Sequence, residues 1–363
     1  MGPIEEAINE FQERQLNVYK ADPDRIVRDT RVAERAAKDH VGRWFFELLQ
    51  NSDDAMASKV SILFEDDAVY VADNGSGIKS QAVSAICGTD FSDKKSGTIG
   101  RKGVGFKSVY EITINPQVIT VNGEGIEFSP SKTQEWLREK NFSDQYHQYP
   151  PFQWIPFFLS WENAISQYPV LSTFCNYKTI VRLPINSNEN QTEKIHDVLR
   201  EFLPHTLLAF RHVQEIKTPD FEIILIPGDD IWEMRDSRED TPILWRVAKC
   251  NQQVPEEFEA SLGKDEWRAI CTDGVSFMVA APIQENCVGP TENCFPVHVF
   301  YPTDQLGPVR LLLHAEFLVK SDRTALMPIE DSTFNQWIAE RLALHICDFV
   351  QDSYSQEKPS HHL

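Results

Sequence analysis

The sequence predicts an α+β protein with two domains, the first opening with helices and the second rich in strands. Its 363 residues are enough for two hydrophobic cores. Apolar residues recur at helical spacing over residues 3–20, whereas the first β-rich run starts only at Val60. A polar break at 187–193 precedes a second series of strand-like runs. The predicted parts are a first domain at 1–187, a second domain at 188–340, and a C-terminal helix with its tail at 341–363.

Three helices are predicted before the first strand. The amphipathic stretch 3–20 ends at an Asp-Pro turn signal, and a second helix follows at 24–38. Gly42 separates this second helix from a third at 43–55. The start of the chain is therefore expected to be helical throughout.

A β-hairpin and a lid are predicted next. Two β-rich runs, at 60–64 and 69–72, are joined by three acidic residues, and the second run delivers Asp73 to a strand end. There, a buried carboxylate is in position to meet the edge of a base. The polar, glycine-punctuated stretch 88–104 predicts a lid. Further strands are expected at 112–121, 179–183, 221–226, 245–249, 276–281 and 297–301, and further helices at 195–210 and 337–350.

The segment 144–170 is unusually rich in aromatic residues and proline. We expect an insertion here. A docking surface built from its tryptophans, Trp154 and Trp161, is the alternative interpretation.

Two carboxylates and a carboxamide share one narrow stripe of the third predicted helix. At about 100° per residue, Asn51 lies about 40° to one side of Glu47 and Asp54 about 20° to the other. The opposite half of the helix, with Phe45 and Leu48, is apolar. An acidic stripe alone is usually a solvated face, but such a face normally mixes in Lys or Arg. Oxygen ligands suit Mg²⁺, and a carboxylate can take a proton from water.

Glycines cluster after the predicted lid, at Gly100, Gly103 and Gly105. Backbone without Cβ atoms lets N–H groups approach an anion, and a helix expected to start at Val104 would offer its N-terminus to phosphate. The pattern is neither a Walker A loop nor a clean G-x-G-x-x-G after a strand. A glycine run alone is usually a flexible loop. Positive charge comes from Arg101, Lys102 and Lys107.

Taken in order, these blocks resemble the motifs of the GHKL ATPases, the family of gyrase, the ninety-kilodalton heat-shock chaperone, histidine kinases and MutL. The matching blocks are 47–55, the Asp-Asn-Gly-Ser-Gly-Ile run at 73–78, 100–108 and 178–184. A lone Asp-x-Gly-x-Gly is more often a turn, but independent motifs in the family's order favour a site. Within this family, the residues of the motifs most resemble the sacsin-like branch, which includes NO VEIN-type proteins. The resemblance implies the Bergerat fold, a mixed sheet covered by helices, followed by a strand-rich α/β transducer-like domain.

The resemblance also implies ATP or ADP with Mg²⁺ as ligands and gives roles to the matched residues. Glu47 would orient and deprotonate the attacking water, Asn51 would ligate Mg²⁺, and Asp73 would accept a hydrogen bond from the adenine amino group. Further contacts to the nucleotide are expected from Asp54, Gly75, Gly77, Ile78, Gly100, Lys102, Gly103, Val104, Gly105, Phe106, Lys107 and Thr179.

In the second domain, the stretch 317–326 resembles the chaperone's middle-domain loop that brings an arginine to the γ-phosphate. This resemblance implies that Arg323 is catalytic, with Lys320 as the fallback. Thr324 stands where the family has an acidic residue, and a surface loop that ends a strand is the alternative interpretation.

The composition of the chain disfavours several kinds of partner and cellular location. The net charge of −20 disfavours nucleic acid as a partner. The sequence contains no uninterrupted apolar run long enough for a membrane span and no secretory leader at its start. The seven scattered cysteines suit reduced thiols in a cytoplasmic protein.

The leading hypothesis is slow, Mg-dependent ATP hydrolysis coupled to closure of the lid and the domains, in a chaperone-like or remodelling role. The alternative is a non-catalytic ATP-sensing module within a larger complex or a longer protein. A histidine kinase is disfavoured because only His40 precedes the motifs. The expected partners, besides ATP, are a protein client and a second copy in a nucleotide-dependent dimer.

Overall fold

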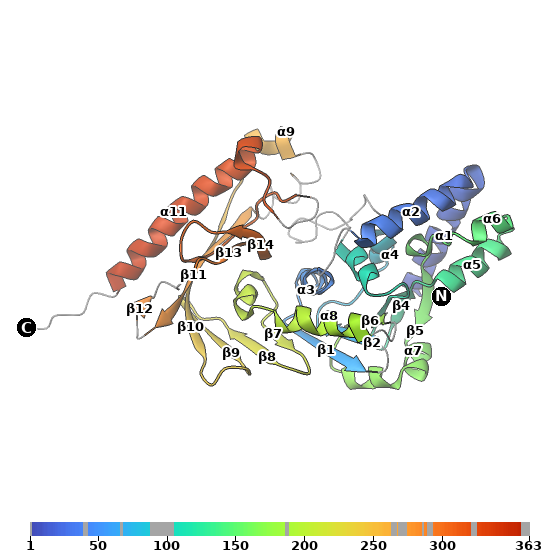
Figure 1. Ribbon diagram of the computed structural model, residues 1–363, viewed down its shortest axis with the longest axis horizontal. Helices are drawn as coiled ribbons and strands as arrows, with labels where there is room; N and C mark the ends of the chain where they lie inside the picture. The colour runs from blue at the N-terminus through green and yellow to red at the C-terminus, as the bar shows by residue number, and fades with distance from the viewer. Residues whose placement is uncertain are drawn as a thin grey trace, which may run out of the picture. The chain divides into compact units, whose positions relative to one another are not determined.

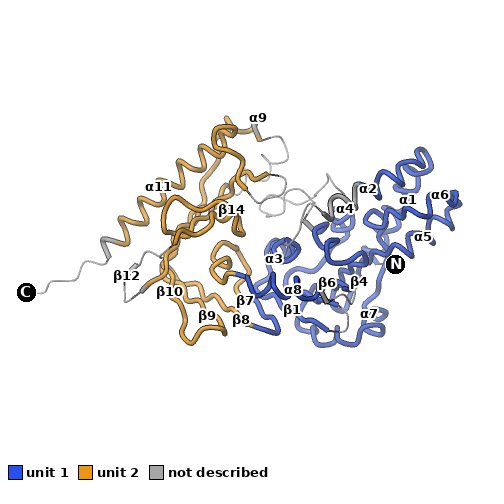
Figure 2. The backbone as a smooth tube through the Cα atoms, viewed as in Figure 1, with its two compact units in different colours: residues 1–94, 99–202, 216–220 blue, residues 95–98, 203–215, 221–363 orange. Residues whose placement is uncertain are grey.

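A computed structural model describes most of the chain and divides it into two compact units, coloured in Figure 2. The described residues are 2–38, 43–65, 68–87, 105–185, 189–262, 267, 274–284, 287–288, 293–320 and 325–356. Unit 1 comprises residues 1–94, 99–202 and 216–220, and unit 2 comprises residues 95–98, 203–215 and 221–363.

The division between the units falls after Phe202, and not at the predicted polar break. Helix α8 (Glu189–Arg200) belongs to unit 1 because aromatic contacts hold it there. The Phe202 ring meets the Phe45 ring edge to face at 5.4 Å, and His196 stacks on Phe64 with 4.3 Å between ring centroids. The polar residues that suggested a boundary only precede this helix.

Unit 1 begins with the three predicted helices, α1 (Pro3–Ala21), α2 (Asp24–Lys38) and α3 (Trp44–Asp54). The backbone N–H of Ile4 donates to Oε2 of Glu124 at 3.0 Å, so a carboxylate from the sheet caps the start of α1. The remaining helices of this unit, besides α8, are α4 (Gln81–Cys87), η1 (Gly105–Glu111), α5 (Pro130–Glu139), α6 (Asp144–His147), η2 (Phe152–Trp154), α7 (Trp161–Gln167) and η3 (Pro169–Phe174).

The described strands of unit 1 follow the order β7-β1-β2-β6-β3-β4-β5, and the pairs between β1 and β5 are antiparallel. Their bounds are β1 (Lys59–Glu65), β2 (Ala68–Asp73), β3 (Gln117–Thr120), β4 (Glu124–Glu127), β5 (Phe157–Ser160), β6 (Thr179–Pro184) and β7 (Glu215–Lys217). The predicted hairpin is confirmed. The strand expected at 112–121 is shorter, because the chain turns at Asn115, whose N–H donates to Thr113 Oγ1.

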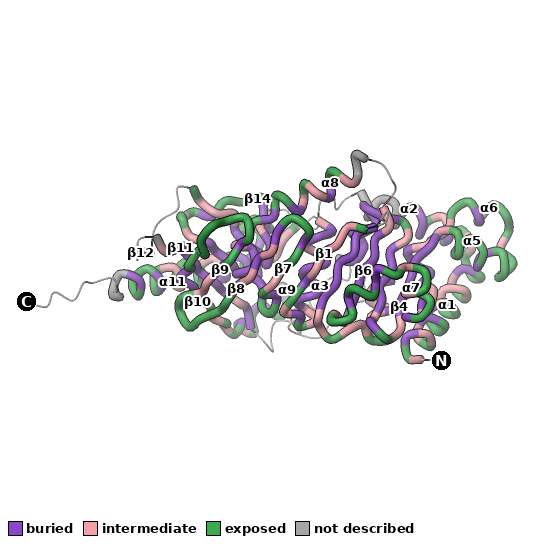
Figure 3. Tube along the Cα trace, turned by 90° about the horizontal axis from the view of Figure 1, so that it is seen from below, coloured by how far each residue is buried: buried purple, intermediate pink, exposed green. Residues whose placement is uncertain are grey.

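Helices cover both faces of this sheet (Figure 1). Tyr70 and Ile180 belong to a core cluster with Trp161 and Leu171, so α7 and η3 cover one face. Because side chains alternate along a strand, Asp73 and its neighbours in register face the other way, toward α3. Figure 3 shows β6 buried along its length within this sandwich. The predicted α+β class, with a mixed sheet covered by helices, is confirmed.

The aromatic segment 144–170 is part of this fold and does not form a docking surface from its tryptophans. Trp154 and Trp161 are only 9% and 8% exposed. Strand β5 extends the sheet beside β4, and Trp161 belongs to the core under α7. The aromatic residues were conspicuous in the sequence because they fill the interior.

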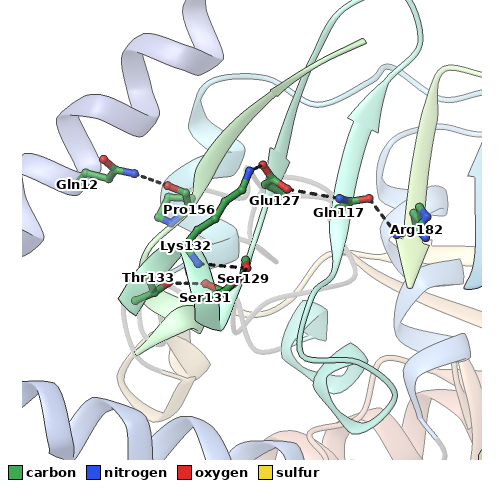
Figure 4. A network of polar contacts seen from close by, with 9 residues as sticks. All are labelled: Gln12, Gln117, Glu127, Ser129, Ser131, Lys132, Thr133, Pro156 and Arg182. Carbon is green, nitrogen blue, oxygen red and sulfur yellow. Dashed lines mark hydrogen bonds and ion pairs between the residues drawn. The ribbon is translucent and has the colours of Figure 1, made fainter. Parts of the chain in front are cut away.

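A polar network ties the strands of unit 1 to its helices (Figure 4). Lys132 of α5 pairs with Glu127 of β4, and Gln117 Nε2 donates to Glu127 at 3.4 Å. Arg182 of β6 donates to Gln117 Oε1 at 3.4 Å and to the Tyr70 hydroxyl at 3.1 Å. The buried guanidinium is therefore matched by acceptors on both neighbouring strands.

Unit 2 is a strand-rich layer with one long helix. The described strand order is β8-β9-β10-β11-β15-β13-β14, with β12 beside β11, and the sheet is mixed because β13 runs parallel to β15. Its elements are η4 (Pro204–Ala209), β8 (Glu222–Ile226), β9 (Ile231–Asp236), β10 (Ile243–Gln252), η5 (Glu256–Phe258), α9 (Glu259–Leu262), β11 (Val275–Gln284), β12 (Cys287–Val288), β13 (Pro296–Val299), β14 (Tyr301–Leu306), β15 (Leu312–Ala315), η6 (Ile329–Asp331) and α11 (Thr333–Gln356).

In this part of the chain, the structure differs from three of the predictions. The helix expected at 195–210 ends with α8, because Pro204 forces Leu203 into an extended conformation. The strand expected at 297–301 is two strands, joined at Phe300 with φ of 66°. The C-terminal helix does not form a separate part, because Trp337 of α11 packs on Phe277 of β11.

No helix in the described ranges combines the length and the hydropathy that crossing a bilayer requires.

Candidate nucleotide site

Asp73 stands in a row of polar residues that crosses three neighbouring strands. It ends β2 directly opposite Thr179, the first residue of β6, and Thr179 is in turn opposite Thr120 of β3. Residues opposite one another in antiparallel strands present their side chains on the same face. The strand pairing therefore brings together two residues that the sequence singled out, and it adds Thr120, which the sequence analysis missed.

The Asp73 carboxyl group is buried but well supplied with hydrogen bonds. It is 7% exposed, and the N–H of Gly75 donates to its Oδ1 at 2.8 Å. Burial raises the pKa of Asp73 to about 6, whereas hydrogen bonds from Gly75, Thr179 and Ser52 work in the opposite direction. Near neutral pH the group is an acceptor-only carboxylate in a sheltered position, which suits the amino group of a base.

The loop after Asp73 packs tightly against the end of α3. A Cβ atom on Gly75 would lie 2.6 Å from the carbonyl oxygen of Ala55, and Ser76 N donates to that same oxygen at 2.9 Å. Gly77 has φ of 77°, a conformation that favours glycine. Ile78 follows and is half-buried. The two glycines are therefore required by close approach and by backbone conformation, respectively.

The stripe on α3 is not a solvated face. Glu47 is only 5% exposed, and Asn51 and Asp54 are half-buried. The Ser52 hydroxyl donates to the carbonyl oxygen of Leu48 at 3.1 Å and lies near enough to the Asp73 carboxyl group to lower its pKa, so α3 lies close to the end of β2. Ser52 lies inside the first sequence motif, but its role depends on this packing and could not be inferred from helical spacing.

Part of the third motif lies in η1, which packs against α3. Phe106 is buried against Tyr110 and Phe128, in an aromatic cluster. Lys107 is also buried, with Nζ 4.0 Å from the centroid of the Trp154 ring. The helix expected from Val104 is observed as a 3₁₀ helix from Gly105. The predicted residues Gly100, Lys102, Gly103, Val104 and Arg323 lie outside the described residues.

These residues fit a purine nucleotide with a divalent cation better than a preformed metal centre. Across the part of the chain that the structure describes, no three Asp, Glu, His or Cys side chains gather as a metal site. Mg²⁺ commonly binds through one or two protein ligands together with substrate phosphates. The half-buried Asn51 carboxamide on α3 is a residue that could hold Mg²⁺ in that mode.

Comparison with known proteins identifies the class of this unit. Residues 44–148 match the family model described as "Histidine kinase-, DNA gyrase B-, and HSP90-like ATPase". The chain therefore contains a GHKL-type ATPase domain, and this assignment supports ATP binding.

The chain is similar at low identity to a plant protein and to a solved structure. The chain is 23% identical over 313 residues to Protein NO VEIN of Arabidopsis thaliana, an alignment that covers 81% of this chain but only 11% of that protein. A crystal structure of the N-terminal domain of a DNA repair protein superposes with a TM-score of 0.40 at 13% identity, over 86% of this chain and 98% of that one.

Proposed function

We propose that unit 1 binds Mg·ATP and hydrolyses it slowly. The observation that carries this proposal is the buried Asp73 carboxylate, in register with Thr179 and close to Ser52 of the helix that bears Glu47 and Asn51. Asp73 would accept from the adenine amino group. The base end of the site and the acidic stripe are therefore linked through one helix, α3.

Positioning and charge neutralisation account for most of the catalysis of phosphoryl transfer. Glu47 would take the proton of the attacking water, and its burial keeps that proton transfer away from bulk solvent. Asn51, one helical turn later, would bind Mg²⁺, which neutralises charge on the phosphates when bound. The glycine-rich run, including Gly100 and Gly103, would contact the phosphates from the lid.

Arg323 is proposed to act on the γ-phosphate from unit 2. Its loop is anchored at both ends by Asn335 of α11, which is fully buried. Asn335 Oδ1 accepts from Leu318 N at 2.8 Å, and its Nδ2 donates to the carbonyls of Leu318 and Met327 at 2.9 and 3.0 Å. The described residues on either side of Arg323 are therefore held by one buried side chain of α11.

The wider role is proposed on the likeness to NO VEIN and to the sacsin-like branch. Nucleotide-driven closure would remodel a protein client, in a cytoplasmic protein that dimerises when ATP binds. A module that senses ATP without turnover is the second candidate. Steady-state turnover by the wild type, absent in a Glu47 variant, separates the two candidates.

ADP affinity is expected to depend on pH through Asp73. Its pKa, raised to about 6, means that the group is increasingly protonated below that pH and must lose its proton before it can accept from the amino group. Affinity should be constant above about pH 7 and fall up to about tenfold per pH unit below 6. Calorimetric titrations between pH 5 and pH 8 measure this dependence.

The matched control is Thr179→Val. The Thr179 hydrogen bond lowers the pKa of Asp73, so its removal should move the midpoint of the pH dependence upward. A midpoint that stays in place would assign the pH dependence to ionisation of ADP itself and contradict the role given to Asp73.

A further inference from the structure

Lys107 is a charged side chain that solvent hardly reaches. It is 2% exposed, although it belongs to the glycine-rich motif that is proposed to hold phosphates. A phosphate oxygen has to reach an ammonium group in order to bind it. A phosphate could therefore reach the Lys107 ammonium group only after this side chain became more exposed.

Trp154 provides the surface on which the ammonium group rests. The Nζ atom of Lys107 lies 4.0 Å from the centroid of the Trp154 ring, well within the range of a cation–π interaction, and Trp is the best ring for this contact. Such contacts strengthen when both groups are desolvated, as here.

Trp154 lies in η2, a short turn that packs against neighbouring helices. The backbone N–H of Trp154 donates to the carbonyl oxygen of Pro151 at 2.9 Å. The adjacent Phe152 ring meets Tyr110 of η1 at 5.6 Å, and α2 packs against both η1 and η2. Part of the aromatic segment whose role the sequence left open thus packs against η1, which carries Lys107.

We propose that Trp154 is a positioning residue that retains the Lys107 ammonium group away from the nucleotide, so that bound phosphates must draw it off the ring. This proposal rests on the proposed function of unit 1. The contact would make part of the phosphate binding energy conditional on movement of η1, where Lys107 resides. Adenosine has no phosphate, so its binding would not depend on Lys107.

The test compares the affinities of ATP and adenosine, measured by calorimetry on the full chain, in four proteins: wild type, Trp154→Phe, Lys107→Met and the double variant. Trp154→Phe keeps an aromatic ring with a weaker hold on a cation. We expect it to bind ATP about three- to tenfold more tightly, with unchanged adenosine affinity. In the Lys107→Met background, the same change should have no effect on ATP affinity.

Trp161→Phe is the matched control, because Trp161 is similarly buried but lies in the core on the opposite face of the sheet. It should leave the ratio of ATP to adenosine affinity unchanged. Thermal melting of each variant identifies general loss of structure, which would weaken both ligands together.

Amine labelling with mass spectrometry gives a second readout that needs no nucleotide. Labelling of Lys107 should be slow in the wild type and at least several-fold faster in Trp154→Phe. An unchanged or lower ATP-to-adenosine ratio in Trp154→Phe, or an equal effect with and without Lys107, would overturn the proposal. If instead the wild type binds neither ligand, the proposed function fails, while the labelling rates still report on the Trp154 contact.

Discussion

Glu47→Ala is expected to abolish turnover while ATP affinity stays close to that of the wild type. The variant loses the carboxylate that would take the proton of the attacking water but keeps Asn51, the proposed Mg²⁺ ligand one turn along α3. General-base contributions are about 10²–10⁴-fold, so phosphate release should fall by that factor. Steady-state phosphate release and calorimetry on the same samples measure the two quantities.

Two variants control this result. Glu47→Gln keeps the size and much of the polarity of the buried side chain and should be as inactive as Glu47→Ala. Asn51→Ala should instead weaken binding of Mg·ATP itself. Unchanged turnover in either Glu47 variant would show that another group serves as the base.

Arg323→Ala is expected to give the second large effect, a loss of turnover with nearly unchanged ADP affinity. An arginine supplied by unit 2 would neutralise charge only at the γ-phosphate, which ADP lacks. Arginine fingers contribute about 10³–10⁵-fold in other phosphoryl-transfer proteins, and a slow ATPase is expected to use the lower end or less. Phosphate release under saturating ATP measures the effect.

Arg310→Ala is the matched control, because Arg310 is an exposed arginine of the same unit. It should behave as the wild type, and Lys320→Ala tests the fallback residue. If Arg323→Ala and Arg310→Ala turn over ATP at the same rate, unit 2 does not supply the catalytic arginine through this loop.

The sequence was most informative where short-range patterns decide the structure. The spacing of Glu47, Asn51 and Asp54 predicted a helix, and the β-rich runs around an acidic turn predicted the hairpin that ends at Asp73. Both depend on local periodicity, which can be recognised without knowing any tertiary contact. The GHKL-type domain was likewise recognisable from contiguous motifs.

Features that depend on distant pairing could not be predicted in the same way. Thr120 joins the polar row only because β3 pairs with β6, although they are far apart in the chain. Ala55 accepts a hydrogen bond from Ser76 only because the end of α3 packs against the loop after β2. The burial of Trp154 likewise depends on packing, and a Trp-rich segment by itself is equally compatible with a surface or an interior.

The most direct test of the account is a calorimetric titration of ADP and ATP into the wild type and Asp73→Asn. Asparagine has nearly the same shape but can also present donors toward the adenine amino group. If Asp73 reads that amino group, the wild type binds both nucleotides, and the variant loses affinity for both by a similar factor. Normal ADP binding by Asp73→Asn, or a loss confined to ATP, would contradict the assignment of the base pocket on which the proposed site is built.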